Sequence, residues 1–145
     1  MQIYQDLLGL TFSQIKNPPS VWYKDVTMYE VKDSATKKLL GHFYLDLYPR
    51  PDKFNHAACF TISKRNRYSA TKTQTAVAAM VTNLTPPTAT EPSLLPHENV
   101  VTFFHEFGHV MHNMCNEANY TKFAGAQVER DFVEMPSQML ENWIW

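Results

Sequence analysis

The sequence predicts an α+β fold in which a small antiparallel sheet is followed by helices. Residues 21–85 hold short runs that are rich in β-branched and aromatic residues or that alternate apolar with polar side chains, a pattern typical of strands. Residues 97–145 instead repeat their apolar side chains at helical spacing. A connector at 86–96, which contains four prolines, separates the two parts. By length, the whole of 1–145 fits one domain.

The N-terminal elements follow from local patterns. Residues 2–8 predict a short helix that Gly9 ends. Residues 21–31 favour a strand, and residues 42–49 alternate apolar and more polar side chains before a proline ends them. The polar segment at 32–38 joins these two runs, so we expect an antiparallel hairpin.

Two further strands are predicted at 56–62 and 74–84, joined by a polar loop at 63–73. The run at 74–84 is rich in alanine and also fits a helix, and we favour the strand. The edge of the sheet at 56–60 could pair with an extended peptide by adding it as a further strand.

Two helices are predicted after the connector. The first spans about 98–116, with Pro96 near its first turn. Its apolar residues recur every three or four positions: Val100, Phe103, Phe104, Phe107, Val110, Met111 and Met114. The second spans about 129–145, with Pro136 as a kink or a restart. It carries apolar residues spaced for burial up to Trp145 and no cap, so we expect the chain to be a piece of a longer protein.

The composition argues against several classes of function. Thirteen basic and fourteen acidic residues give a formal net charge of −1, which does not suggest a nucleic-acid surface, and the basic run at 64–67 is interpreted as a solvated loop. No apolar run approaches the roughly 20 residues that span a bilayer. The N-terminus has neither a basic region nor a small-residue cleavage site, so a signal peptide is not supported.

The two cysteines bear on the compartment. Without a secretion signal, Cys59 and Cys115 are expected to be free buried thiols in a reducing environment. We therefore expect a cytoplasmic protein, with the mitochondrial intermembrane space as the alternative.

Three histidines and one acid lie on the first predicted helix. His105 and His109 are four residues apart, about 40° from superposition, so both rings can converge on one metal ion. Glu106 is offset by about 100°, which places it beside the metal, where it can take a proton from water. A single histidine would most often be a core or surface residue, but the pattern H-E-x-x-H weakens that reading. His112 shares the face and lies a turn further on, so we expect it to pack or to support a ligand.

A third ligand and a close contact are also expected. A catalytic zinc takes three protein ligands and keeps a fourth position open. The downstream candidates are Glu117, Glu129, Asp131, Glu134 and Glu141. The first of these is too close in sequence to double back, whereas the last two share a face of the second helix. Gly108 costs stability in the middle of a helix, so we expect a strand or a substrate to approach it closely.

The segments "FFHEFGHVMHNMC" and "VERDFVEMPSQMLENWIW", preceded by "GHFYLDLYPR" and "HAACF", resemble the thimet oligopeptidase and neurolysin family of zinc peptidases over nearly the whole chain. The resemblance implies one Zn²⁺ per chain, held by His105, His109 and Glu134, with Glu106 as the general base. It makes Glu141 a plausible partner that orients a ligand histidine, although a solvent-exposed Glu141 is an equal alternative.

The resemblance also implies that the sheet and the zincin-type active-site helices are part of a larger, mostly helical fold, in which two domains flank a deep channel that admits only short peptides. Further tyrosines and a histidine of the family's site follow the ligand glutamate and would lie in the missing remainder of the parent chain. Three functions are therefore compared: a zinc endopeptidase acting on short peptides, a truncated fragment that keeps the zinc site or the fold without turnover, and a helical interaction module with a chance motif. No substrate-binding residue is predicted.

Overall fold

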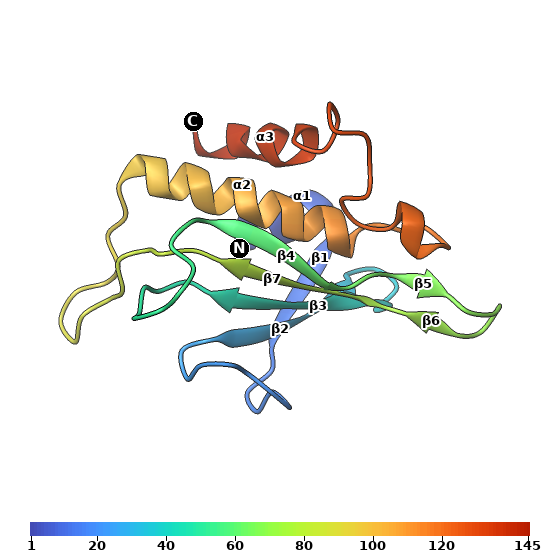
Figure 1. The fold of residues 1–145 in the computed structure, drawn as a ribbon, viewed down its shortest axis with the longest axis horizontal. Coiled ribbons are helices and arrows are strands. Elements are labelled where there is room, and N and C mark those ends of the chain that lie inside the picture. Colours follow the sequence, from blue (N-terminus) through green and yellow to red (C-terminus); the bar gives the residue numbers. More distant parts are fainter.

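The structure is a computed structural model that describes residues 1–145. Its elements form three layers (Figure 1): a five-stranded sheet, the long helix α2 (His97–Met114) across one face of that sheet, and α3 (Met135–Glu141) on the far side of α2. The short helix α1 (Gln2–Leu8) packs beside α2 and leads directly into the first strand. None of these helices has the length and apolar character that crossing a bilayer requires.

The sheet has the spatial order β1-β2-β3-β7-β4. Its strands, in that order, are Leu10–Gln14, Thr27–Asp33, Leu39–Asp46, Ala76–Val81 and Ala58–Ser63. All neighbours pair antiparallel except β3 and β7, which run parallel. A separate small hairpin of β5 (Asn66–Arg67) and β6 (Thr73–Gln74) projects from one end. Two short 3-10 helices complete the chain, η1 (Thr121–Phe123) and η2 (Asn142–Ile144).

The predicted α+β class is confirmed, but the strands differ from expectation in four respects. The hairpin of β2 and β3 and the alanine-rich strand β7 are present, but the parallel pair between β3 and β7 was not foreseen. The strand expected at 21–31 begins only at Thr27, and the preceding aromatic residues lie in a loop. Strand β1 was missed. The loop expected at 63–73 contains β5 and the first residue of β6.

The helical part differs from expectation at its end. Helix α2 matches the predicted helix to within two residues at each end. The second helix, expected over 129–145, covers only Met135–Glu141. Pro136 lies in its first turn. Because proline has no backbone N–H to donate to a carbonyl oxygen of the preceding residues, the helix begins here and does not continue from them. Both cysteines are free, as expected, but Cys115 is exposed and Cys59 only partly buried.

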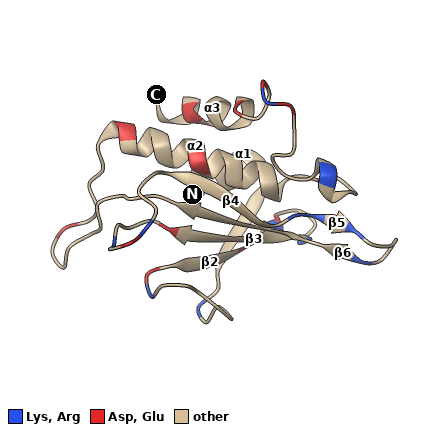
Figure 2. Cartoon of the chain, viewed as in Figure 1, with Lys and Arg blue, Asp and Glu red and all other residues tan.

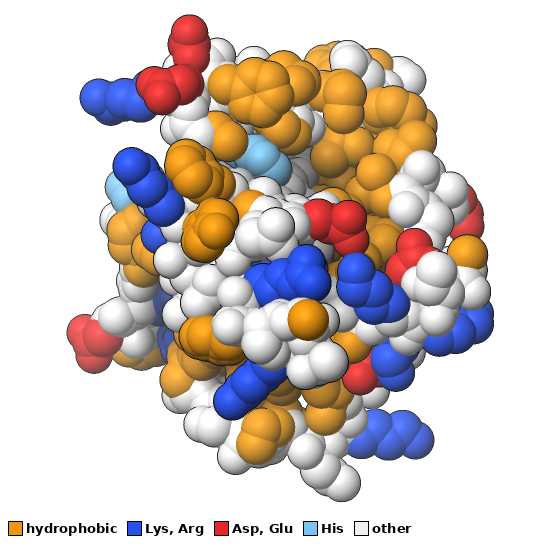
Figure 3. Space-filling model, turned by 90° about the vertical axis from the view of Figure 1, so that its right-hand side faces the viewer, with side chains coloured by type: hydrophobic (Ala, Val, Ile, Leu, Met, Phe, Trp, Pro, Cys, Tyr) orange, Lys and Arg blue, Asp and Glu red, His pale blue; other side chains and the backbone are white.

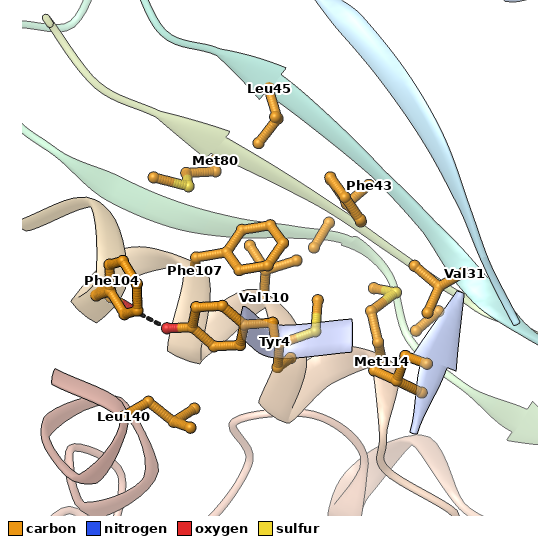
Figure 4. Close-up of a cluster of buried hydrophobic side chains, with 14 residues drawn as sticks. Tyr4, Val31, Phe43, Leu45, Met80, Phe104, Phe107, Val110, Met114 and Leu140 are labelled. Carbon is orange, nitrogen blue, oxygen red and sulfur yellow. Dashed lines mark hydrogen bonds between the residues drawn. The ribbon is translucent and has the colours of Figure 1, made fainter. Parts of the chain in front are cut away.

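The hydrophobic core lies between α2, α1 and the sheet. Figure 4 shows Phe107 of α2 close to Phe43 of β3 and Tyr4 of α1. The centroid of the Phe107 ring lies 4.8 Å from that of Tyr4 and 5.2 Å from that of Phe43, and both ring pairs have an edge-to-face geometry. The Tyr4 hydroxyl donates a hydrogen bond to the Phe104 carbonyl oxygen at 2.6 Å. Burial of these aromatic rings fixes the rotation of α2 about its own axis.

A buried ion cluster ties the end of β3 to the loop that follows it. Asp46 is 4% exposed and accepts two hydrogen bonds from Arg50, at 2.7 and 2.9 Å, and one from Trp22 Nε1 at 2.8 Å. Lys53 Nζ lies 2.9 Å from the same carboxylate. Burial alone would raise the pKa of Asp46, but the hydrogen bonds from Arg50, Trp22 and Lys53 outweigh it and lower the pKa to about 2.

We expect Asp46→Asn to lower the free energy of unfolding by about 3–5 kcal/mol at pH 7, because it leaves the Lys53 ammonium buried without its counter-ion. The folded-state pKa of Asp46 is lowered to about 2, so its contribution is present above the unfolded pKa of about 4 and is lost as the pH falls toward 2. Urea unfolding of the protein that carries this chain, between pH 7 and pH 2, measures both effects.

The matched control is Glu30→Gln, which breaks a partly exposed pair with Lys32 and should change stability by less than about 1 kcal/mol. If Asp46→Asn behaved like this control, the cluster would not stabilise the fold.

Candidate metal centre

Helix α2 presents His105 and His109 on its face away from the sheet, toward α3. Four residues separate them, which is slightly more than one helical turn, and their ring centroids are 4.9 Å apart. Neither α2 nor α3 contains a lysine or arginine, whereas both carry glutamates (Figure 2). The two helices therefore meet in a region whose charges favour a cation.

Glu134 immediately precedes α3 and brings its carboxylate between the two histidines. Its Oε2 atom lies 3.1 Å from His105 Nε2 and 3.0 Å from His109 Nε2. The three ligand atoms lie within 4.8 Å of one another, and no other group of three or more His, Cys, Asp or Glu residues in the chain converges in this way. The site combines two neighbouring turns of one helix with the start of another.

This arrangement fits a tetrahedral metal ion. Metal–ligand bonds of about 2.0–2.1 Å at tetrahedral angles put neighbouring ligand atoms about 3.3 Å apart. The two spacings from Glu134 Oε2 to the histidine nitrogens, 3.0 and 3.1 Å, are close to that value, and all three atoms lie within 4.8 Å of one another. Two imidazole nitrogens and one carboxylate oxygen are a donor set that zinc accepts, and three protein ligands leave a fourth position open.

Glu141, at the end of α3, lies behind His105. Its Oε1 atom is 2.7 Å from His105 Nδ1, and its side chain is largely buried. A carboxylate on Nδ1 holds the proton there, so that Nε2 keeps a free lone pair directed at Glu134. The residue is thus in a position to orient His105.

Glu106 is buried and does not belong to the ligand group. Burial raises the pKa of its carboxyl, the histidines at 105 and 109 lower it, and the Glu134 carboxylate raises it again. The backbone N–H of Cys59 in β4 also favours the charged form. Glu106 therefore lies between the face of α2 that carries His105 and His109 and the edge strand of the sheet, with a pKa above its ordinary value.

The remaining predicted residues lie outside the group. Glu117 forms an exposed ion pair with Lys38 at 3.0 Å. Glu129 and Asp131 contribute no atom to the group of ligands. His112 has a buried Nδ1 atom with no hydrogen-bond partner, and burial, with the neighbouring His109, lowers its pKa. Its partly buried side chain lines a pocket between α2 and α3.

The close contact at Gly108 is made by α3. A Cβ atom at this position would lie 2.7 Å from Ser137 Cα, so the expected strand or substrate is in fact a neighbouring helix. Ser137 was missed by the sequence reasoning. Its hydroxyl lies 3.0 Å from Glu134 Oε2, and nothing in the sequence marks it except its place three residues after that glutamate.

The family model and the relatives that match this chain all point to one family of peptidases. The family model described as "Peptidase family M3" matches residues 1–145. A thimet-like oligopeptidase of Dictyostelium discoideum is 50% identical over 98% of this chain, saccharolysin of Saccharomyces cerevisiae 39% over 100%, and oligopeptidase A of Escherichia coli 35% over 99%. In each case the match covers only 21% of the relative, so this chain spans about a fifth of their length.

Proposed function

This chain belongs to peptidase family M3. From its family and its geometry, we propose that it carries the metal-binding half of a zinc endopeptidase that cleaves short peptides. The observation that carries the proposal is the convergence of His105 Nε2, His109 Nε2 and Glu134 Oε2. One Zn²⁺ per chain would be held by these three atoms.

When bound at such a site, zinc acts as a Lewis acid that polarises a carbonyl group and lowers the pKa of water to about 7. Glu106 is the chain's general base: it takes a proton from the attacking water and returns it to the leaving amine. Its burial suits both steps, because a raised pKa brings the carboxyl nearer to the working pH. Glu141 keeps the proton of His105 on Nδ1 throughout.

The substrate class is supported by the relatives and by the sheet. The names of the Dictyostelium and Escherichia relatives describe oligopeptidases. Strand β4 is an edge strand, and the backbone N–H of its Cys59 is directed at Glu106. An extended peptide that paired with this free edge would pass beside the proposed base.

A second candidate is a fragment that keeps the fold or the metal without turnover. The chain is about a fifth as long as its relatives. Figure 3 shows hydrophobic side chains gathered at the top of the molecule, where α3 lies in Figure 1. At the C-terminal end of the chain, Met139, Trp143 and Trp145 are also exposed. An apolar surface of this kind is normally covered by other protein.

We expect one zinc per folded protein, and His105→Ala or Glu134→Ala to abolish or strongly weaken its binding, because each removes one of three ligands. Elemental analysis of the protein that carries this chain measures the stoichiometry. His112→Ala is the control and should retain the metal. Full stoichiometry in both ligand variants, or its loss in the control, would show that the ligands are assigned wrongly.

We expect Glu106→Gln, placed in the full-length protein that carries this chain, to keep the zinc and to lower turnover of a quenched short peptide by about 10²–10⁴-fold, because the amide keeps the size of the side chain but cannot accept the proton. Metal content and steady-state kinetics are measured on the same preparation. Turnover close to wild type would place the base elsewhere.

For the isolated chain 1–145, we expect aggregation or partial unfolding, weaker zinc binding than in a longer protein, and little peptidase activity. Each large apolar side chain left in water forgoes roughly 1.5–3 kcal/mol, against a total stability of about 5–15 kcal/mol. Light scattering, denaturant unfolding and peptide turnover test this. A monomeric, cooperatively folded chain with ordinary enzyme rates would contradict it and would mean that the metal half of the site suffices for turnover.

A further inference from the structure

We propose that Ser137 is a positioning residue for the metal ligand Glu134, and that Gly108 is the residue that lets Ser137 reach it. The inference rests on the proposed metal-binding function and adds two residues to it. Neither residue offers a ligand atom to the group formed by His105, His109 and Glu134. Both would act by fixing where the third ligand lies.

Ser137 acts on the same oxygen that faces the histidines. Its side chain is 0% exposed, and its hydroxyl lies 3.0 Å from Glu134 Oε2 and 2.9 Å from the Glu134 backbone oxygen. The hydroxyl has one proton, and a charged carboxylate is the stronger acceptor of the two. The hydroxyl therefore donates to Oε2 when Glu134 is ionised, which is the form that binds a metal.

Apart from the contacts of its Oε2 atom with the two histidines, the Glu134 carboxylate has Ser137 as its one side-chain hydrogen-bond partner. Its side chain is 50% exposed, and it occupies the N-cap position of α3 without a capping hydrogen bond of its own. A half-exposed glutamate can adopt many side-chain conformations, and ordering it on binding a metal costs entropy. A hydrogen bond from the fully buried Ser137 selects the conformation in which Oε2 lies between the histidines before any metal arrives.

Gly108 sets the distance between the two helices at this point. A Cβ atom there would lie 2.7 Å from Ser137 Cα and 3.3 Å from Ser137 Cβ. Both contacts are with the first turn of a helix rather than with the end of a flexible side chain, so α3 would have to move. Gly108 lies between the two ligand histidines in the sequence. Any shift of α3 away from it would carry both Glu134 and Ser137 away from the histidine nitrogens.

The alternative is that both residues only pack the helices together. Helix propensity alone predicts that Gly108→Ala strengthens α2, because alanine is the better helix former. A packing role predicts a loss of stability in both variants, with no selective effect on the metal. A positioning role instead predicts a loss of metal affinity that depends on the presence of Glu134.

The test measures zinc affinity by competition with a chelator, and urea unfolding of the metal-free form, in the protein that carries this chain. We expect Ser137→Ala to weaken zinc binding by about 10–100-fold, the usual effect of removing a group that orients a ligand. Gly108→Ala should also weaken it, despite its higher helix propensity. In a Glu134→Ala background, Ser137→Ala should cause no further loss.

Thr82→Val is the matched control. The Thr82 hydroxyl is also buried and donates to a backbone oxygen, that of Leu47, at 3.0 Å. Its removal should lower stability and leave zinc affinity unchanged. Two results would overturn this inference alone, provided that the wild-type protein binds zinc. One is a zinc affinity that Ser137→Ala leaves unchanged. The other is a loss of zinc affinity that Ser137→Ala causes equally with and without Glu134. A wild-type protein that binds no zinc would overturn the proposed function and this inference with it.

Discussion

The burial of Phe107 is the contact on which the rest of the structure depends. Its ring is fully buried against Tyr4, Phe12 and Phe43. Successive residues of a helix are about 100° apart, so residues two positions to either side of Phe107 fall on the opposite face, about 40° from each other. Those residues are His105 and His109. Packing one aromatic ring on the sheet thus turns both histidines toward α3 and leaves Glu106 on the flank.

The fold could be predicted where local pattern and tertiary contacts agree. Helix α2 buries an apolar stripe along its length, so its 3.6-residue repeat was sufficient. The run at 21–26 was misassigned because its aromatic residues contact the ion cluster instead of pairing in the sheet. Trp22 donates to Asp46, and the Tyr23 ring lies 4.4 Å from the Arg50 guanidinium carbon. Strand β1 is only five residues long, and Leu10 is its only buried residue, which gave too little alternation.

The residues of the candidate site also differ in how far the sequence could predict them. The spacing of His105, Glu106 and His109 defines their geometry within one helix, so the sequence alone suggested a metal pair with an acid beside it. The proposed third ligand depends on where α3 lies. Of five acidic candidates, Glu117 was set aside as too close in sequence, and four stayed open until the family resemblance selected Glu134. The contact of Ser137 with Gly108 joins two helices in space, and the two residues are 29 positions apart in the sequence. No local pattern encodes such an approach.

The central claim is that two imidazoles of α2 and one carboxylate at the start of α3 bind a single zinc ion. X-ray absorption at the zinc edge, measured on the loaded protein, tests it most directly. The predicted spectrum has only nitrogen and oxygen neighbours at about 2.0–2.1 Å, with outer-shell scattering from two imidazole rings. A sulfur neighbour at about 2.3 Å, or scattering that requires three imidazoles, would contradict the claim, because Cys115, Cys59 or His112 would then be a ligand.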